Sequence, residues 1–585
     1  MLFYDFEVFK YDWLLVVIDM TEKKEHVIVN DAAALEKLYK EKVTDIWVGF
    51  NSRNYDQYIL KAILCGFDPK RVNDHIIVKG KPGWKFSSLF RKFPLNNYDV
   101  MANIDRGLKV FEGFMGNNIK ETSVDFNIDR KLTQREIEET IKYCRHDVQQ
   151  TIEVFLKRKE DFTAHMGLVK IACQGHGLDL SLISKTKPQL SAIILEATQQ
   201  SRDDEFDIDF PDTLKIEKYT HVLDWYRNPE NHCYARHEPG KKTPKKTQLV
   251  TTIAGCSHQF GWGGVHGALE KYCGEGFYLM ADVASLYPSL MIRYNLHSRN
   301  MKDPKKYVQI YEQRLKLKAE GNPLQLPLKL VLNSTYGVMK DPSNGLYDPR
   351  QANRVCVYGQ LLILDLIERL EPYCQLIQSN TDGILIKMND PNDYYLIDDI
   401  CAEWEERTGL TLEFDEYRKV FQKDVNNYVV VPHGDLYDSK GKPRWKSKGT
   451  YVKKLNPLDY DLPIINKALI DYMVQGIPIE KTIMGCSDLK EFQLVSKISG
   501  KYDCILHGDK VVNEKCVRIF ASINESDAGM QKVHAKTKKA AKIPNSPEHC
   551  FVWNDEVNGV QCPAKLDKRW YVELALKRLK DFGVI

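Results

Sequence analysis

The chain has 585 residues and a net charge of +3, with 43% hydrophobic and 28% charged residues. This length predicts about four domains, and no apolar run approaches the roughly 20 residues of a membrane span. Asp5 and Glu7 stand where a signal peptide needs positive and then apolar residues, so we expect the protein to stay in the cytoplasm. The 14 cysteines form no C-x-x-C pair, which argues against a zinc ribbon.

The N-terminal part has the periodicity of an α/β domain. A long helix is predicted after Thr133, because Thr133 and Glu136 form a capping box and apolar residues then recur at spacings of three and four. The predicted strands cover residues 2–9, 13–20 and 45–50, and the predicted helices cover residues 56–64 and 133–155.

Farther along the chain, residues 238–246 read as a basic, proline-containing loop, for which we favour a solvated surface over a nucleic-acid contact. Residues 376–388 are two apolar runs around Asn-Thr-Asp-Gly, which predicts a β-hairpin. No motif is apparent after about residue 455. Residues 307–336 are helical in pattern, with interruptions near Gly321, Pro323 and Pro327.

Four carboxylates and a tyrosine form the first candidate site. Asp5 and Glu7 share one face of a predicted strand, and Asp56 opens a predicted helix. Tyr143 and Asp147 share a helix face. If these elements meet, two divalent cations would neutralise the acids and support phosphodiester cleavage, with Tyr143 orienting the attacking water. Each piece alone also fits ordinary surface charge.

A second candidate site lies in the C-terminal half. Asp282 ends an apolar strand, and Ser285 then precedes a predicted helix whose first backbone amides could meet phosphate oxygens. Asp382 lies at the tip of the predicted hairpin. Two carboxylates bridging two magnesium ions suit in-line attack of a 3′-hydroxyl on an α-phosphate. The alternative is an ordinary capped strand-to-helix turn.

Lys329, Asn333 and Tyr336 form one stripe of a predicted helix. A cation, an amide and an aromatic ring on one face can hold a triphosphate and stack on a base or sugar. Arg314 lies one helix upstream and could add charge, although its neighbourhood also reads as a solvated face. Lys446, Lys448 and Tyr451 suit contact with a nucleic-acid backbone, or equally an amphipathic strand.

These motifs resemble those of family B DNA polymerases in order and spacing. Asp282–Ser289 (DVASLYPS), Lys329–Gly337 (KLVLNSTYG) and Thr381–Gly383 (TDG) are similar to polymerase motifs A, B and C. Three further segments resemble the proofreading exonuclease motifs: Asp5–Glu7, Asn51–Asp56 and Tyr143–Asp147. Tyr98 and Asp99 lie between the second and the third of these segments. WGG at residues 262–264 resembles the linker of small phage members, and the cluster of Lys446, Lys448 and Tyr451 is similar to the family's primer-binding motif.

The resemblance implies an α/β multidomain fold, with an RNase H-like exonuclease followed by a right-hand polymerase of palm, fingers and thumb. We expect the exonuclease at residues 1–175, a linker at 176–250, palm at 251–305 and 356–455, fingers at 306–355 and thumb at 456–585. It also implies roles for single residues. Nucleotide contacts would come from Ser285, Leu286, Tyr287, Arg314, Lys329, Asn333 and Tyr336; DNA contacts from Asn51, Trp262, Gly263, Gly264, Lys446, Lys448 and Tyr451; and metal ligands from Asp282, Val283, Asp382, Asp5, Glu7, Asp56 and Asp147.

Two departures from the family pattern bear on function. Motif C usually begins with an acid, whereas this chain has Asn380; Asp382 preserves the second acid, so we expect activity. The interval between Asp282 and Lys329 is too short for the insertion of protein-primed phage polymerases, so we expect an ordinary nucleic-acid primer.

The resemblance implies two Mg²⁺ ions per active site, with Mn²⁺ as a substitute, and primer-template DNA and dNTPs as partners. We expect a monomer, of phage or plasmid origin, that works with a helicase, primase or processivity factor and without a membrane. The alternatives are a protein-primed polymerase and an exonuclease with a degenerate, DNA-binding palm.

Overall fold

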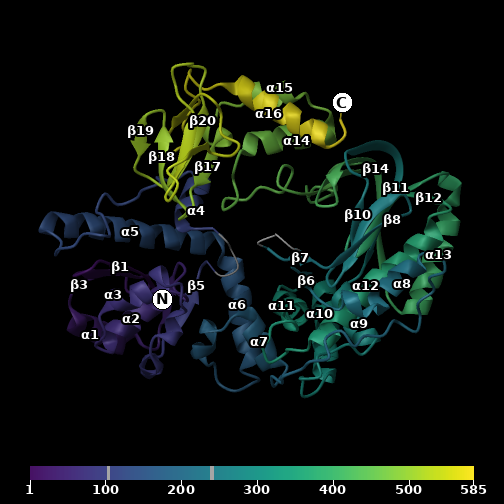
Figure 1. Ribbon diagram of the computed structural model, residues 1–585, viewed down its shortest axis with the longest axis horizontal. Coiled ribbons are helices and arrows are strands. Elements are labelled where there is room, and N and C mark those ends of the chain that lie inside the picture. The colour runs from purple at the N-terminus through teal and green to yellow at the C-terminus, as the bar shows by residue number, and fades with distance from the viewer. Residues whose placement is uncertain (102–105, 238–242, 585) are drawn as a thin grey trace. The chain divides into compact units, whose positions relative to one another are not determined.

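The structure is a computed structural model that describes residues 1–101, 106–237 and 243–584. It is a mixed α/β protein with several separate sheets, as the sequence predicts at this level (Figure 1). The chain forms two compact units, each built from three stretches of sequence. Unit 1 comprises Met1–Thr186, Leu455–Ile464 and Met484–Tyr571, and unit 2 comprises Lys187–Lys454, Ile465–Ile483 and Val572–Ile585.

Unit 1 contains a five-stranded mixed sheet in the order β3-β2-β1-β4-β5. The strand β1 is antiparallel to β2 and parallel to β4. Alternate residues of β1, among them Tyr4 and Phe6, join a core with Trp47 and Leu60, which leaves the other face of β1 for Asp5 and Glu7. The strands are β1 (Leu2–Val8), β2 (Trp13–Asp19), β3 (Lys24–Val29), β4 (Ile46–Gly49) and β5 (Asn96–Asp99).

A long helix, α5, lies against the second face of β1. Phe155 of α5 packs edge-on against Phe3, with ring centroids 5.2 Å apart. The predicted capping box is confirmed, because Thr133 Oγ1 accepts from Glu136 N and Glu136 Oε2 accepts from Thr133 N. The helices of this region are α1 (Ala32–Lys42), α2 (Asp56–Leu64), α3 (Pro69–Asn73), α4 (Leu108–Met115), α5 (Gln134–Lys157) and α6 (Lys159–Ala172).

Residues Met484–Tyr571 also belong to unit 1, and we call them the C-terminal β module. The stretch 456–585, predicted as a single thumb, therefore contributes to both units, and its thumb role stays a prediction. The module contains a three-stranded sheet, β17-β20-β23, and a four-stranded sheet, β19-β18-β21-β22. Its strands are β17 (Leu494–Lys497), β18 (Tyr502–His507), β19 (Lys510–Val512), β20 (Cys516–Ala521), β21 (Met530–His534), β22 (Ala540–Lys542) and β23 (Cys550–Val552).

Unit 2 is built on a nine-stranded antiparallel sheet in the order β16-β15-β14-β11-β13-β12-β10-β9-β8. The hairpin predicted at residues 376–388 is confirmed as β12 and β13. Part of the predicted basic loop, residues 238–242, lies outside the described residues. The strands are β6 (Ala235–Arg236), β7 (Lys245–Lys246), β8 (Gln248–Ile253), β9 (Cys256–Gly261), β10 (His266–Ala268), β11 (Tyr272–Val283), β12 (Cys374–Ser379), β13 (Gly383–Met388), β14 (Leu412–Asp424), β15 (Asn427–Pro432) and β16 (Lys446–Lys448).

The helix α12 is almost wholly buried and packs on β12 and β13 (Figure 1). The predicted helical stretch 307–336 is confirmed as α10 and α11, which are interrupted around Gly321 and Pro323. Pro327 does not interrupt α11, because it lies in the first turn, where a missing backbone N–H is tolerated. The helices are α7 (Lys187–Ile194), α8 (Thr220–Arg227), α9 (Leu286–Arg293), α10 (Lys305–Ala319), α11 (Gln325–Val338), α12 (Pro349–Leu370), α13 (Tyr394–Thr408), α14 (Pro463–Gln475), α15 (Ile479–Gly485) and α16 (Lys568–Asp581).

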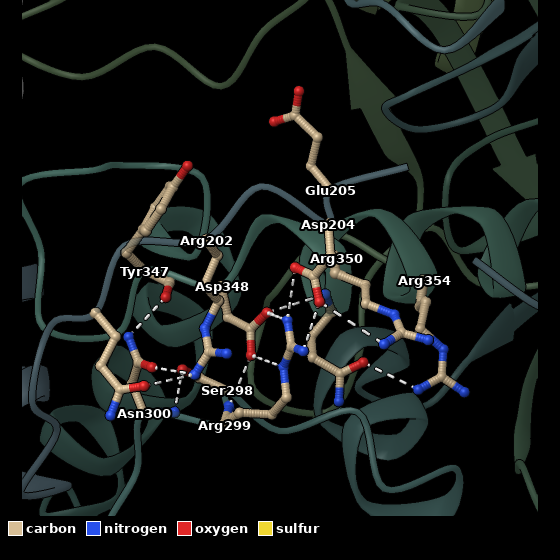
Figure 2. Close-up of polar contacts among 12 residues, drawn as sticks. Arg202, Asp204, Glu205, Ser298, Arg299, Asn300, Tyr347, Asp348, Arg350 and Arg354 are labelled. Atoms are coloured by element: carbon tan, nitrogen blue, oxygen red, sulfur yellow. Dashed lines mark hydrogen bonds and ion pairs between the residues drawn. The ribbon is translucent and has the colours of Figure 1, made fainter. Parts of the chain in front are cut away.

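An ion-pair network fixes the start of α12 within unit 2. Figure 2 shows the Arg299 guanidinium between the carboxylates of Asp348 and Asp204. Arg299 donates to Asp348 from its backbone N (2.8 Å), Nε (2.9 Å) and Nη2 (2.7 Å). Asp348 is fully buried and caps α12, so the segment after α9 is tied to the first turn of the helix beneath the sheet.

Candidate active sites

In unit 1, the predicted carboxylates come together from three elements. β1 supplies Asp5 and Glu7, α2 begins at Asp56, and α5 supplies Asp147. Phe6 N donates to Asp56 Oδ1 at 3.3 Å, which attaches the start of α2 to β1. Asp5 and Glu7 are each close enough to Asp56 and Asp147 for the negative charges to repel one another. The structure therefore brings the four predicted acids together, and their catalytic role stays a prediction.

Burial and repulsion make this cluster hard to ionise. Burial raises the pKa of Asp56 to about 7 and that of Asp147 to about 6. The pKa values of Asp5 and Glu7 are also well above their usual range, first because of burial and then because of the neighbouring carboxylates. A carboxylate cluster of this kind suits divalent cations, which would restore the charged forms.

Lys109 is a member of this cluster that the sequence analysis missed. It projects from α4, and its Nζ donates to Asp147 Oδ1 (2.5 Å) and to Glu112 Oε1 (3.0 Å). The same ammonium lies 4.7 Å from the centroid of the Tyr143 ring. One lysine cannot balance the surrounding carboxylates, so the cluster remains acidic. No local pattern in the sequence indicates this role of Lys109. Its partner Asp147 lies on another helix, and its pairing with Glu112 is an ordinary i, i+3 contact within α4.

Tyr143 also lies at this site, and Asn51 lies in the loop that leads into α2. Burial raises the pKa of Tyr143, so its hydroxyl stays protonated and can donate a hydrogen bond. Asn51 has a left-handed backbone (φ 59°), and its N donates to Asp99 Oδ1 at 2.9 Å. Arg53 N donates to the other oxygen of Asp99 at 3.1 Å. Asp99, which has no firm role in the sequence prediction, therefore holds the loop that leads into α2.

In unit 2, the sheet brings Asp282 beside the tip of the β12–β13 hairpin. Asp282 is paired with Gly383 across β11 and β13, and Val283 N donates to the backbone oxygen of Asp382 at 2.6 Å. A Cβ on Gly383 would lie only 2.1 Å from Asp282 Oδ1 and 2.6 Å from Ala281 O. The turn therefore requires glycine at position 383. Burial, and then the charge of Asp382, raises the pKa of Asp282 to about 6.

The neighbouring strand β14 adds two acids that the sequence analysis missed. Glu413 pairs with Asp282 across the sheet, and Asp415 follows two residues later. Lys446 Nζ contacts Asp415 Oδ2 at 2.6 Å, and its charge also acts on Asp282. Lys446, predicted as a DNA contact, thus lies at the edge of the acidic centre. The spacing of Glu413 and Asp415 on one strand face was a usable signal, similar to that of Asp5 and Glu7.

Asn380 opens the turn between β12 and β13. Its backbone N donates to Gly383 O at 2.8 Å, which closes the turn. Its side-chain Oδ1 is buried and has no hydrogen-bond partner among the described residues. An unsatisfied buried oxygen beside Asp282 and Asp382 fits a cation nearby, since a buried acceptor without a donor is costly.

The residues predicted to bind nucleotide lie on α9, α10 and α11. Arg314 is largely buried, and its Nη1 donates to Ser285 Oγ at 3.0 Å, so it supports the turn before α9. Tyr287 and Tyr336 stack with ring centroids 4.0 Å apart. Leu286 is buried in the first turn of α9, whereas Lys329 and Asn333 are exposed on α11.

The WGG segment is held against the hairpin turn and the core. Trp262 is only 5% exposed, and its indole donates to Asn231 O at 2.9 Å. Gly264 touches the turn, because a Cβ there would lie 2.2 Å from Thr381 Oγ1. Gly263 O accepts from Gln360 Nε2 at 2.6 Å. The indole is therefore committed to the core, and the backbone oxygens of Trp262 and Gly263 accept hydrogen bonds from Lys340 and Gln360.

Two cations flank the ring of Tyr451. Lys423 Nζ lies 4.9 Å and the Arg578 guanidinium 4.2 Å from the ring centroid, and all three residues belong to unit 2. Lys448 is exposed on β16, the edge strand of the nine-stranded sheet. This arrangement is a basic and aromatic surface of the kind that contacts nucleic-acid backbones.

The comparisons with known proteins give a distant structural similarity and no family assignment. No family model matches the chain, and no curated protein matches it. A family B DNA polymerase from the hyperthermophilic archaeon Pyrobaculum calidifontis is similar in structure, with 13% identity and a TM-score of 0.39, over 100% of this chain and 78% of that chain. Within the described residues, no helix has the length and apolarity needed to cross a membrane.

Proposed function

We propose that this protein is a DNA-dependent DNA polymerase of family B with a 3′→5′ exonuclease. The observation that carries the proposal is the occurrence of two separate carboxylate centres, each assembled from residues that also follow the order of the family's motifs. Asp282 and Asp382 form the polymerase centre in unit 2, and Asp5, Glu7 and Asp147 belong to the exonuclease centre in unit 1.

Both centres fit divalent cations, of which Mg²⁺ is the proposed one. Asp282 and Asp382 would hold the ions in unit 2, and the backbone oxygen of Val283 is a further proposed ligand. Asn380, whose buried Oδ1 has no hydrogen-bond partner among the described residues, lies in the same turn as Asp382. The ions would supply charge neutralisation at the reacting phosphate. Lys329 is exposed on α11 and free to meet a triphosphate, while the stacked ring of Tyr287 would restrict the space at the sugar 2′ position.

For the exonuclease, the chain itself supplies the groups around the scissile phosphate. The Tyr143 hydroxyl would donate to the phosphate or orient the attacking water, because its raised pKa keeps it protonated. Lys109 would stabilise negative charge that develops on the phosphate. A mixed sheet with antiparallel β1, β2 and β3 followed by parallel β4 and β5 is consistent with the proposed RNase H-like fold.

The proposed partners are primer-template DNA and dNTPs, with a helicase, primase or processivity factor in replication of a phage or plasmid genome. A protein-primed polymerase is the second candidate, and labelled dNMP attached to protein would identify it. An exonuclease with a degenerate palm is the third, and its support is Asn380 in place of an acid.

A primer-extension assay with single-site variants tests the proposal. The wild-type protein should extend a 5′-labelled recessed primer with dNTPs and Mg²⁺, and shorten it without dNTPs. Asp382→Asn should abolish extension and keep shortening, whereas the double variant Asp5→Ala, Glu7→Ala should do the reverse. Shortening without extension under both Mg²⁺ and Mn²⁺ would refute the polymerase and favour the degenerate palm.

A further inference from the structure

The helix that carries Lys109, α4, depends on its neighbours for stability. α4 has eight residues, and a helix this short is marginal in isolation. Six of its residues are buried, so its stability comes from its neighbours. On one side it contacts α5, which carries Asp147, and on another it contacts β17 and β20 of the C-terminal β module. The module therefore forms part of the wall that supports Lys109.

Arg518 of β20 is the main polar link between the module and α4. Its side chain is 0% exposed, and its guanidinium donates to backbone carbonyls and to the side-chain oxygen of Gln493. Nη2 donates to Gly113 O (3.0 Å) and Asn117 O (2.8 Å) at the end of α4. Nη1 donates to Asp555 O at 2.7 Å within the module. A cation at the carbonyl end of a helix is favourable, and the planar guanidinium joins both sides through several bonds.

Close apolar packing adds a second link that does not depend on charge. A Cβ at Gly113 would lie 2.6 Å from Val495 Cγ1 of β17, so glycine lets the helix lie directly on the strand. The chain after α4 is then joined to the module by backbone hydrogen bonds. Ile119 N donates to Asn554 O at 2.8 Å, and Val557 N donates to Gly116 O at 2.9 Å.

We propose that the C-terminal β module positions the exonuclease lysine, with Arg518 as the positioning residue that acts through α4 on Lys109. This inference rests on the proposed exonuclease function. It gives the module a part in nucleotide removal, although the sequence expectation for this stretch was a polymerase thumb. Arg518 touches neither the acidic cluster nor any reacting atom; it fixes the helix whose first turn delivers the ammonium to Asp147.

Two variants, one at Arg518 and one at Gly113, independently weaken the contact between α4 and the C-terminal β module. Arg518→Lys keeps the positive charge and loses the planar guanidinium, which donates both to the end of α4 and to Asp555 O in the module. Gly113→Ala keeps Arg518 and introduces a methyl group against Val495, and adding Val495→Ala should relieve that contact. Tyr571→Phe is the matched control, because within the described parts of the chain its buried hydroxyl bonds only to Phe492 O and Ala521 N inside the module.

Single-turnover primer shortening and dNTP-dependent extension are measured on each purified full-length protein, together with thermal unfolding. Arg518→Lys and Gly113→Ala should each reduce the maximal shortening rate about tenfold, since small misplacements of a reacting group are costly. The apparent affinity for DNA and the extension rate should stay within about twofold, and Gly113→Ala, Val495→Ala should recover most of the shortening rate. Tyr571→Phe should lower the unfolding temperature without a selective loss of shortening.

A double-mutant cycle with Lys109→Ala separates positioning from general stabilisation. If Arg518 acts through Lys109, Arg518→Lys should cause less than about a twofold further loss in the Lys109→Ala background. An equal loss with and without Lys109, or a parallel loss of extension, would overturn the inference. If Asp5→Ala, Glu7→Ala leaves shortening intact, the proposed exonuclease site itself is wrong and the inference falls with it.

Discussion

Gly383 gives the sharpest test of the acidic centre in unit 2. In Gly383→Ala, the new methyl carbon would lie 2.1 Å from Asp282 Oδ1, where ordinary contact begins near 3.4 Å. Rotation of the Asp282 side chain does not suffice, because the backbone oxygen of Ala281 is also only 2.6 Å away. The hairpin tip therefore has to move by roughly 1 Å, and Asp382 moves with it. Such a displacement should reduce the chemical step by about a hundredfold.

The assay is single-turnover primer extension under saturating dNTP and Mg²⁺, with primer shortening measured on the same protein. Gly500→Ala is the control, because a Cβ at Gly500 meets no atom within 4 Å. Extension by Gly383→Ala should fall about a hundredfold, while shortening and the unfolding temperature should change little. An extension rate within about threefold of the wild type would refute the argument that the close approach of the two strands defines the site.

Three further predictions concern charge and stability. Asp56→Asn removes a carboxyl whose folded pKa is about 7 and whose ordinary value is 3.8, so the wild type loses stability as the pH rises between these values. Without divalent ions, the free energy of unfolding of the variant should rise above that of the wild type by up to about 4 kcal/mol across that pH range, as measured by thermal unfolding. Mg²⁺ should reduce this difference, and a difference that does not depend on pH would contradict the prediction. Lys109→Met should lower primer shortening at least tenfold and leave extension within about twofold, and equal loss of both activities in the gel assay would count against its role. Asp348→Ala should lower the free energy of unfolding, measured by chemical denaturation, by about 3 kcal/mol, because it leaves the Arg299 guanidinium without its buried partner. Asp224→Ala, at an exposed ion pair, should lower it by less than about 0.5 kcal/mol. Similar losses in the two variants would show that burial of the network is unimportant.

Local patterns in the sequence predicted the elements that are defined by neighbouring residues. The capping box at Thr133 and Glu136 gave the start of α5, and the Asn-Thr-Asp-Gly turn gave the β12–β13 hairpin. Asp5 and Glu7 could be assigned to one strand face because side chains alternate along a strand. Pro327 was misjudged because its effect depends on its place in the helix, which only the start of α11 reveals.

Features that depend on distant pairing were not visible in the sequence. Lys109 becomes part of the acidic cluster only when α4 meets α5, and Glu413 lies beside Asp282 only because β14 pairs with β11. The C-terminal β module has short strands without a recognisable motif, so nothing in its sequence indicates that Arg518 inserts against α4. These contacts depend on packing between segments that are distant in the chain, and such packing leaves no periodic pattern among neighbouring residues.

The threading of the chain through both units has a consequence for synthesis on the ribosome. Unit 1 takes in residues up to Tyr571, and unit 2 is completed only by residues after it. A growing chain therefore carries the Lys109 helix for several hundred residues before its supporting strand is made, and Tyr451 precedes Arg578, whose guanidinium contacts its ring, by about 130 residues. Neither unit can reach its final packing until the residues around Tyr571 have been made, so a ribosome that stalls before them would leave both units incomplete.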